Sequence, residues 1–124
     1  MTKALVDLAR MTDAVYRNRL AGLQRLSAEE AKVRQTLASL DAARQIGRSA
    51  LTVDMEMRAI GADLLWQGWV TRQRMEQNIL LANLLIQKEA MRKQLQASFG
   101  RAQVAESLLA SHMASDRNKR NKQN

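Results

Sequence analysis

The chain has 124 residues, enough for one domain, and 46% of them are hydrophobic but only 3% aromatic. Lys and Arg number 20 against 12 Asp and Glu, so the formal net charge of +8 favours acidic partner surfaces. The absence of Cys excludes disulfides, thiolate chemistry and Cys-based metal sites. We find neither a signal peptide nor an apolar run of roughly 20 residues, so we expect a cytoplasmic protein without membrane insertion.

Residues 2–46 have the periodicity of a helix. Their apolar residues recur mostly at steps of three, four or sums of these: Leu5, Leu8, Val15, Leu23, Leu26, Val33, Leu37 and Leu40. Acidic residues precede basic ones by three or four positions, as in Asp7–Arg10, Asp13–Arg17, Glu30–Arg34 and Asp41–Arg44. This order favours a helix. Ser27-Ala28-Glu29-Glu30 also matches a capping box, which would begin a third helix, but no Pro or turn cluster supports a break there.

Residues 47–63 are interpreted as the turning region of a hairpin, with part of it helical. Gly47 and Gly61 bracket this segment, and Ser49, Thr52 and Asp54 are candidate N-caps. Residues 64–113 return to helical spacing, and we expect the helix to continue through Gly68 and Gly100. The tail, residues 114–124, contains no apolar residue after Ala114 and is predicted to be disordered and basic.

The predicted fold is therefore all-α: a long two-helix antiparallel coiled-coil hairpin over residues 1–113, with a disordered basic C-terminal tail. Charge is spread along it, at about +3 for 1–46, −1 for 47–63, +3 for 64–113 and +3 for 114–124. A hairpin this thin is also compatible with a homodimer of four helices, which would cover its Leu and Met residues.

The sequence contains no motif that indicates catalysis, a cofactor or a metal. The single His112 lies close to the tail, where a surface role is the usual one. Because a two-helix hairpin offers no concave pocket, we expect the protein not to be an enzyme.

Two features remain as candidate binding elements. Trp66 and Trp69 are three residues apart and share a helix face, where they either clamp the hairpin near its turn or dock a partner. The tail residues Arg117, Lys119, Arg120 and Lys122 are either a solubilising end or an electrostatic contact with an acidic partner. No aromatics are interleaved with them, so nucleic acid is not the expected partner.

A small basic helical hairpin with Trp66-Gln67-Gly68-Trp69 after the turn, followed by Arg72, Arg74, Leu80, Glu89, Arg92 and Leu95, resembles the FliJ/YscO family. These are stalk proteins of flagellar and virulence type III export machines. The resemblance covers the general plan of nearly the whole chain, although the chain is short for the family and its turn is compact. It implies a protein peripheral to the membrane export apparatus that links a hexameric export ATPase to the export gate.

The resemblance also implies two groups of partner-binding residues. The ATPase would be contacted near Lys3, Arg10, Arg101 and Arg117, and the export gate near Met55, Met57, Trp66 and Trp69. The alternatives are a different helical adaptor or coiled-coil module and, third, a basic protein associated with nucleic acid. The latter would show binding that weakens steeply with salt.

Overall fold

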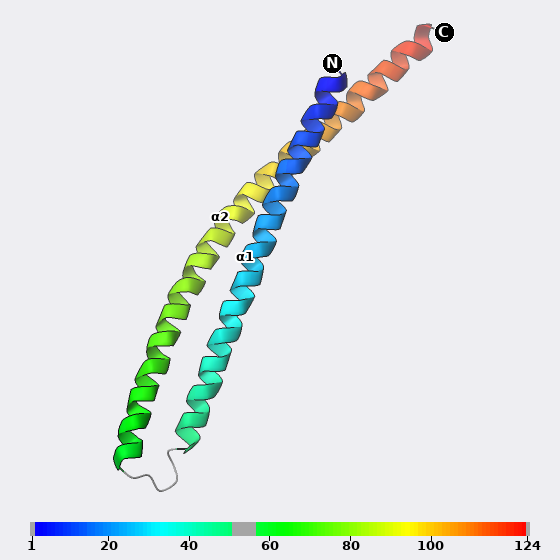
Figure 1. The fold of residues 1–124 in the computed structure, drawn as a ribbon. Helices are drawn as coiled ribbons and strands as arrows, with labels where there is room; N and C mark the ends of the chain where they lie inside the picture. The colour runs from blue at the N-terminus through cyan, green and yellow to red at the C-terminus, as the bar shows by residue number, and fades with distance from the viewer. Residues whose placement is uncertain (1, 51–56, 124) are drawn as a thin grey trace. The chain divides into compact units, whose positions relative to one another are not determined.

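The computed structural model describes residues 2–50 and 57–123, and for residues 48–50 and 57–59 the backbone alone. All described residues lie in two helices, α1 (Thr2–Ala50) and α2 (Met57–Gln123), which pack against each other as a helical hairpin (Figure 1). The prediction of an all-α two-helix fold is confirmed.

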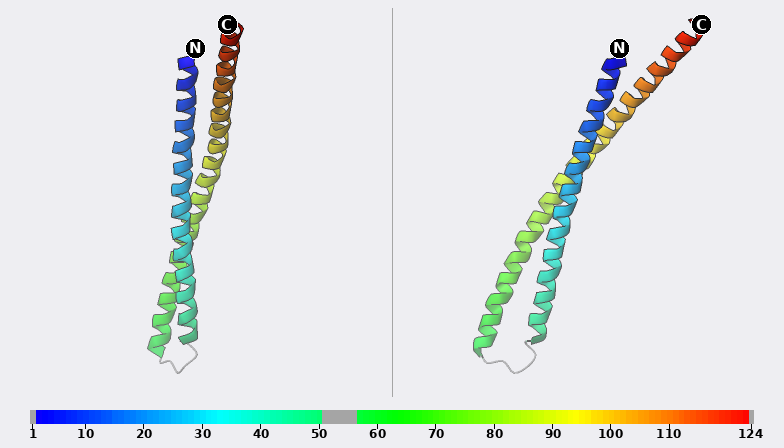
Figure 2. Two further views of the ribbon diagram at one scale, coloured as in Figure 1. Left: turned by 90° about the vertical axis from the view of Figure 1, so that its right-hand side faces the viewer. Right: turned by 45° about the vertical axis from the view of Figure 1, so that its right-hand side comes forward.

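The hairpin divides into two compact units. Unit 1 consists of Met1–Arg25 and Lys88–Asn124, and unit 2 is Leu26–Gln87. Each unit therefore pairs one half of α1 with one half of α2, and both chain ends belong to unit 1. The course of each helix can be followed by its colour in Figures 1 and 2.

The two helices are continuous because nothing in their sequence forces a break. The chain has no Pro, and no described residue has a positive φ angle. Helix α1 passes through Gly22 and Ser27, so the expected continuity is confirmed and the capping-box pattern starts no third helix. Helix α2 likewise continues through Gly68 and Gly100, as expected.

Within each unit the two helices run antiparallel. In unit 1 the rings of Tyr16 and Phe99 lie 5.6 Å apart, and a Cβ added at Gly22 would lie 3.2 Å from Cε of Met91. In unit 2 the ion pair between Asp41 and Arg74 joins α1 to α2 over 2.9 Å. Residues earlier in α1 thus meet residues later in α2, as an antiparallel hairpin requires.

The faces that meet have a heptad spacing. In α1 the less exposed residues recur at alternating steps of three and four: Leu5, Ala9, Thr12, Tyr16, Arg19 and Leu23 in unit 1, and Leu26, Glu30, Val33, Leu37, Leu40, Arg44 and Gly47 in unit 2. The same spacing in α2 gives Asp63, Gln67, Val70, Arg74, Gln77, Leu81 and Leu84 in unit 2, and Lys88, Met91, Leu95, Ser98, Ala102, Ala105 and Leu109 in unit 1. A repeat of seven residues keeps two paired helices in contact along their length.

Little of this contact is fully buried. Among the residues whose side chains the structure describes, the buried ones are Val33, Val70, Leu84, Ser98 and Ala105. The seam also contains charged and amide side chains, and the buried Nε2 of Gln67 and Oγ of Ser98 have no hydrogen-bond partner in the part of the chain that the structure describes. A narrow, partly polar seam contributes less hydrophobic stabilisation than a thick apolar core.

The two helices extend into the predicted turning region, 47–63, which was expected to be partly helical. Of the interval 47–63, residues 47–50 complete α1 and 57–63 begin α2, so Gly47 and Ser49 are helical and do not mark a turn. Gly47 serves packing instead: a Cβ there would lie 2.6 Å from Cζ3 of Trp66. The candidate N-caps Thr52 and Asp54 lie outside the described residues.

The tail also differs from its prediction. Residues 114–123 continue α2 as helix, although their side chains are exposed apart from the half-buried Asp116. Two physical features favour helix here. Arg, Lys and Gln are good helix formers, and Arg120 and Lys122 lie in the last turn, where positive charge compensates the helix dipole. The prediction of disorder rested on the absence of burial, which does not preclude a helix that is already nucleated.

Some predicted charge pairs form and others change partner. Arg17 pairs with Asp13 at 3.0 Å, and Arg34 pairs with Glu30 at 3.4 Å, as expected. Asp41, predicted to pair with Arg44 on its own helix, pairs with Arg74 across the hairpin instead. Single-helix spacing gave no indication of this tertiary contact.

Candidate functional site

Net charge is distributed unequally between the two units. Unit 1 contains 13 Lys and Arg residues against 5 Asp and Glu, whereas unit 2 contains 7 of each. The whole formal charge of +8 therefore belongs to unit 1, and unit 2 is neutral. Sequence segments alone did not reveal this division, because it depends on which half of α1 pairs with which half of α2.

The four basic residues predicted to face an acidic partner all lie in unit 1. Lys3 and Arg10 are exposed on α1, and Arg101 and Arg117 are exposed on α2. The structure thus brings together in one unit residues that are far apart in the sequence. Charges at exposed positions are free of the desolvation cost of burial and remain available to a partner.

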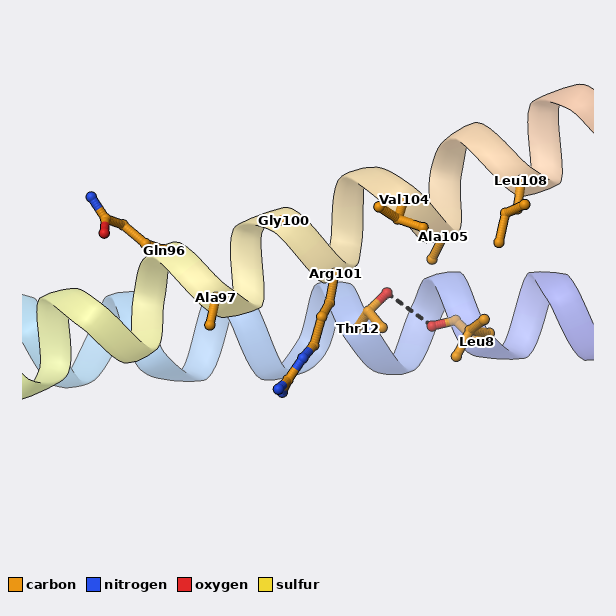
Figure 3. A pocket seen from close by; sticks show the side chains of 9 residues that line it. All are labelled: Leu8, Thr12, Gln96, Ala97, Gly100, Arg101, Val104, Ala105 and Leu108. Carbon is orange, nitrogen blue, oxygen red and sulfur yellow. Dashed lines mark hydrogen bonds between the residues drawn. The ribbon is translucent and has the colours of Figure 1, made fainter.

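Next to Arg101, unit 1 contains an open groove of about 580 Å³ between α1 and α2 (Figure 3). Its lining residues are Leu8, Thr12, Gln96, Ala97, Gly100, Arg101, Val104, Ala105 and Leu108. The hydroxyl of Thr12 donates to the backbone oxygen of Leu8 at 2.9 Å, so its hydrogen-bonding capacity is used within α1. The groove consequently presents a mainly apolar surface with Arg101 at one edge.

Sequence reasoning missed this groove. Leu8 was identified among the periodic apolar residues of 2–46, but it is 43% exposed, and Leu108 on α2 is 50% exposed. Ala97, Gly100 and Ala105 have small or absent side chains and therefore leave space between the helices. The clustering of small residues over 97–105 is the sequence signal that would have indicated it.

No protein-family model, curated protein or solved structure matches this chain. The residues themselves are the basis for any functional interpretation. Among the residues that the structure describes, no group of three His, Cys, Asp or Glu side chains is arranged to hold a metal ion. Neither α1 nor α2, as far as they are described, contains a stretch long and apolar enough to cross a membrane.

The two tryptophans in unit 2 differ in their surroundings. The ring of Trp66 lies against Gly47 of α1, and both residues line an open groove of about 400 Å³ together with Ala43, Ile46 and Asp63. Trp66 thus occupies the clamping position, but it is still 37% exposed. Trp69 is 48% exposed and accessible to a partner.

The two methionines predicted to face the same partner as the tryptophans have no described side chain. Met55 lies outside the described residues, and Met57 is the first residue of α2, described by its backbone alone. The predicted apolar patch of unit 2 therefore consists, in the described part of the chain, of Trp66 and Trp69.

These surfaces suit binding to a protein. Unit 1 combines positive charge with an apolar groove, and unit 2 exposes large apolar side chains without net charge. Exposed apolar surface flanked by polar residues is characteristic of interaction sites, with aromatic and Arg residues supplying much of the binding energy.

Proposed function

We propose that this protein is a non-enzymatic helical interaction protein, and more specifically a stalk or escort protein of a flagellar or type III export ATPase complex. The observation that carries the proposal is the confinement of the net charge to unit 1, the unit that contains both chain ends. Unit 1 would bind the hexameric export ATPase, and unit 2 would meet the export gate.

The electrostatics of unit 1 support this assignment. A basic surface is attracted to the acidic lining of a protein ring without needing a fixed set of contacts. Lys3, Arg10 and Arg117 would contribute charge, and Arg101 would combine charge with the adjacent apolar groove. The neutral unit 2, with Trp66 and Trp69 exposed, would bind its partner through apolar contacts.

The test is recovery of partners from the native cytoplasm with the tagged full-length chain, at moderate salt and with nuclease present. We expect a hexameric export ATPase to be recovered. The variant Lys3→Glu with Arg10→Glu should no longer recover the ATPase, because two charge reversals in unit 1 replace attraction to the acidic partner by repulsion.

Lys32→Glu with Arg34→Glu is the matched control. It makes the same change in net charge within unit 2, at two exposed residues, and removes the ion pair of Arg34 with Glu30. The control should retain the ATPase. Equal loss in both variants would show that total charge matters and not unit 1, which would refute the assignment.

Two other results would replace the proposal by its alternatives. Recovery of nucleic acid that disappears on nuclease treatment, with binding that weakens steeply as salt rises, would indicate a nucleic-acid-associated protein. Recovery of a helical protein unrelated to export would indicate a different adaptor or coiled-coil module.

A further inference from the structure

The side of α2 that faces away from α1 in unit 2 contains a second heptad pattern. Its residues recur at alternating steps of four and three: Gly61, Leu65, Gly68, Arg72, Met75, Ile79, Ala82 and Ile86. We call these eight residues the outer seam. Leu65, Met75, Ile79 and Ile86 are between 60% and 77% exposed, so unit 2 itself leaves the outer seam uncovered.

The outer seam is less polar than the face that packs on α1. Its only charged residue is Arg72, whereas the face toward α1 contains Asp63, Gln67, Arg74 and Gln77 among seven positions. In a solvent-exposed helix the apolar side normally faces the partner helix. Over residues 61–86 the more apolar side of α2 instead faces away from α1. This indicates that α2 has a second helical partner over this segment.

The pattern ends with unit 2. Continuing the same spacing along α2 into unit 1 gives Glu89, Lys93, Gln96, Gly100 and Gln103, which are polar or small. An apolar heptad seam confined to residues 61–86, about 38 Å of helix, has the length of an ordinary helix–helix contact.

Two glycines in the outer seam are not required by packing among the described residues. A Cβ added at Gly61 or at Gly68 would meet nothing within 4 Å, so α1 does not require either glycine. Each glycine within a helix costs about 1 kcal/mol relative to alanine. Small residues at a heptad position allow another helix to approach closely.

The arrangement of large and small residues identifies the second helix as another α2. When two copies of the seam are placed antiparallel about a two-fold axis between Arg72 and Met75, each small residue faces a large one. Gly61 then faces Ile86, Leu65 faces Ala82, and Gly68 faces Ile79. A parallel pairing would instead set glycine against glycine and isoleucine against isoleucine. Facing large and small residues is how helices fill the space between them.

Surface area and charge agree with a second copy. The chain exposes 9612 Å², whereas a globular protein of 14.0 kDa exposes about 6,700 Å². The surplus of about 2,900 Å² exceeds the roughly 1,000–2,500 Å² that each subunit buries in an obligate homodimer. Because unit 2 is neutral and unit 1 carries the charge of +8, two copies would repel each other least through unit 2.

We propose that the outer seam is a homodimer interface in which α2 of one copy packs antiparallel on α2 of a second copy, about a two-fold axis at residues 72–75. At the axis, Arg72 faces Met75 of the second copy and lies within reach of its Glu76. The interface is isologous, as in most soluble homodimers. The proposal is independent of the function proposed above, since neither the basic residues of unit 1 nor Trp66 and Trp69 belong to the outer seam.

The first test measures the mass of the full-length chain by sedimentation equilibrium over a wide range of concentrations. We expect twice 14.0 kDa for the wild-type chain and 14.0 kDa for Ile79→Glu. Val104→Glu is the matched control, because Val104 is 60% exposed on the same helix but lies in unit 1 outside the seam. A wild-type monomer at all concentrations, or dissociation in both variants, would overturn the proposal.

A second variant excludes unfolding as an explanation. Gly68→Leu should strengthen the helix of the single chain, because leucine is a better helix former and its Cβ meets nothing within 4 Å. In the dimer the added side chain would collide with Ile79 of the second copy. We therefore expect undiminished helical circular dichroism with loss of the dimer; a Gly68→Leu dimer would contradict the packing.

The antiparallel register is tested by cross-linking, which the absence of native Cys makes unambiguous. Gly68→Cys mixed with Ile79→Cys should form a disulfide-linked dimer on oxidation, because these positions face each other. Gly68→Cys alone should not, since its two thiols would be separated by eleven residues, or about 16 Å along the helices, too far for a disulfide. Cross-linking of Gly68→Cys with itself, or no cross-linking of the mixture, would refute the register.

Discussion

Alanine substitutions at three glycines offer a graded test of how closely the helices approach. Alanine has a helix propensity about 1 kcal/mol better than glycine, so the outcome depends on what the added Cβ meets. At Gly100 it meets nothing within 4 Å, and Gly100→Ala should raise the free energy of unfolding by about 1 kcal/mol. For a chain of this size the melting temperature should rise by about 4 °C.

At Gly47 the added Cβ would lie 2.6 Å from Cζ3 of Trp66, closer than packed carbon atoms tolerate. Displacing the ring should cost about 1–3 kcal/mol, so Gly47→Ala should be neutral or destabilising by up to about 2 kcal/mol. Gly22→Ala should fall between the other two, because Cε of Met91 at 3.2 Å belongs to a flexible side chain that can shift.

The three variants are compared by urea unfolding and by thermal melting, both followed by far-UV circular dichroism. The expected order of stability is Gly100→Ala, then Gly22→Ala, then Gly47→Ala. If Gly47→Ala gained as much stability as Gly100→Ala, the close approach of Trp66 to α1 would be wrong, and with it the packing of unit 2 near its turn.

Three further variants test the seam and the tail. Ser98→Ala should stabilise the chain by about 1 kcal/mol in urea unfolding, because it removes a buried hydroxyl that has no partner among the described residues. Leu84→Ala should cost about 2–5 kcal/mol, and Leu85→Ala less than about 1.5 kcal/mol, since Leu84 is buried and Leu85 is 41% exposed; equal costs would contradict the orientation of α2. Deleting residues 114–124 removes four basic residues and one acidic residue. It should weaken retention on a cation exchanger while changing the unfolding free energy by less than about 0.5 kcal/mol.

The sequence allowed the two helices to be predicted because their evidence is local. Spacing of apolar residues, acid-before-base pairs and the lack of Pro are all properties of neighbouring residues. Gly47 was interpreted as one boundary of the turning region, whereas it lies within α1 and its lack of a side chain admits the ring of Trp66. That contact joins residues 19 positions apart and has no local signature.

The residues of the candidate site could be predicted from the sequence, but their grouping in one charged unit could not. Lys3, Arg10, Arg101 and Arg117 were identified as basic and accessible, and the structure places them exposed in one unit. The division into a charged and a neutral unit required the antiparallel pairing. Leu8 illustrates the same difficulty, because periodicity identified it as apolar without showing that it lines a groove.

The confinement of charge to unit 1 also has a kinetic consequence. A molecule whose net charge lies in one part has a large dipole moment, and the field of an anionic surface turns it during approach. Encounters are then made through unit 1, with an association rate that falls as salt shortens the screening length, about 8 Å at physiological ionic strength. Contacts of the neutral unit 2 do not depend on that field. Salt would therefore control how quickly the chain arrives at such a surface, and apolar contact would control how long unit 2 holds its own partner.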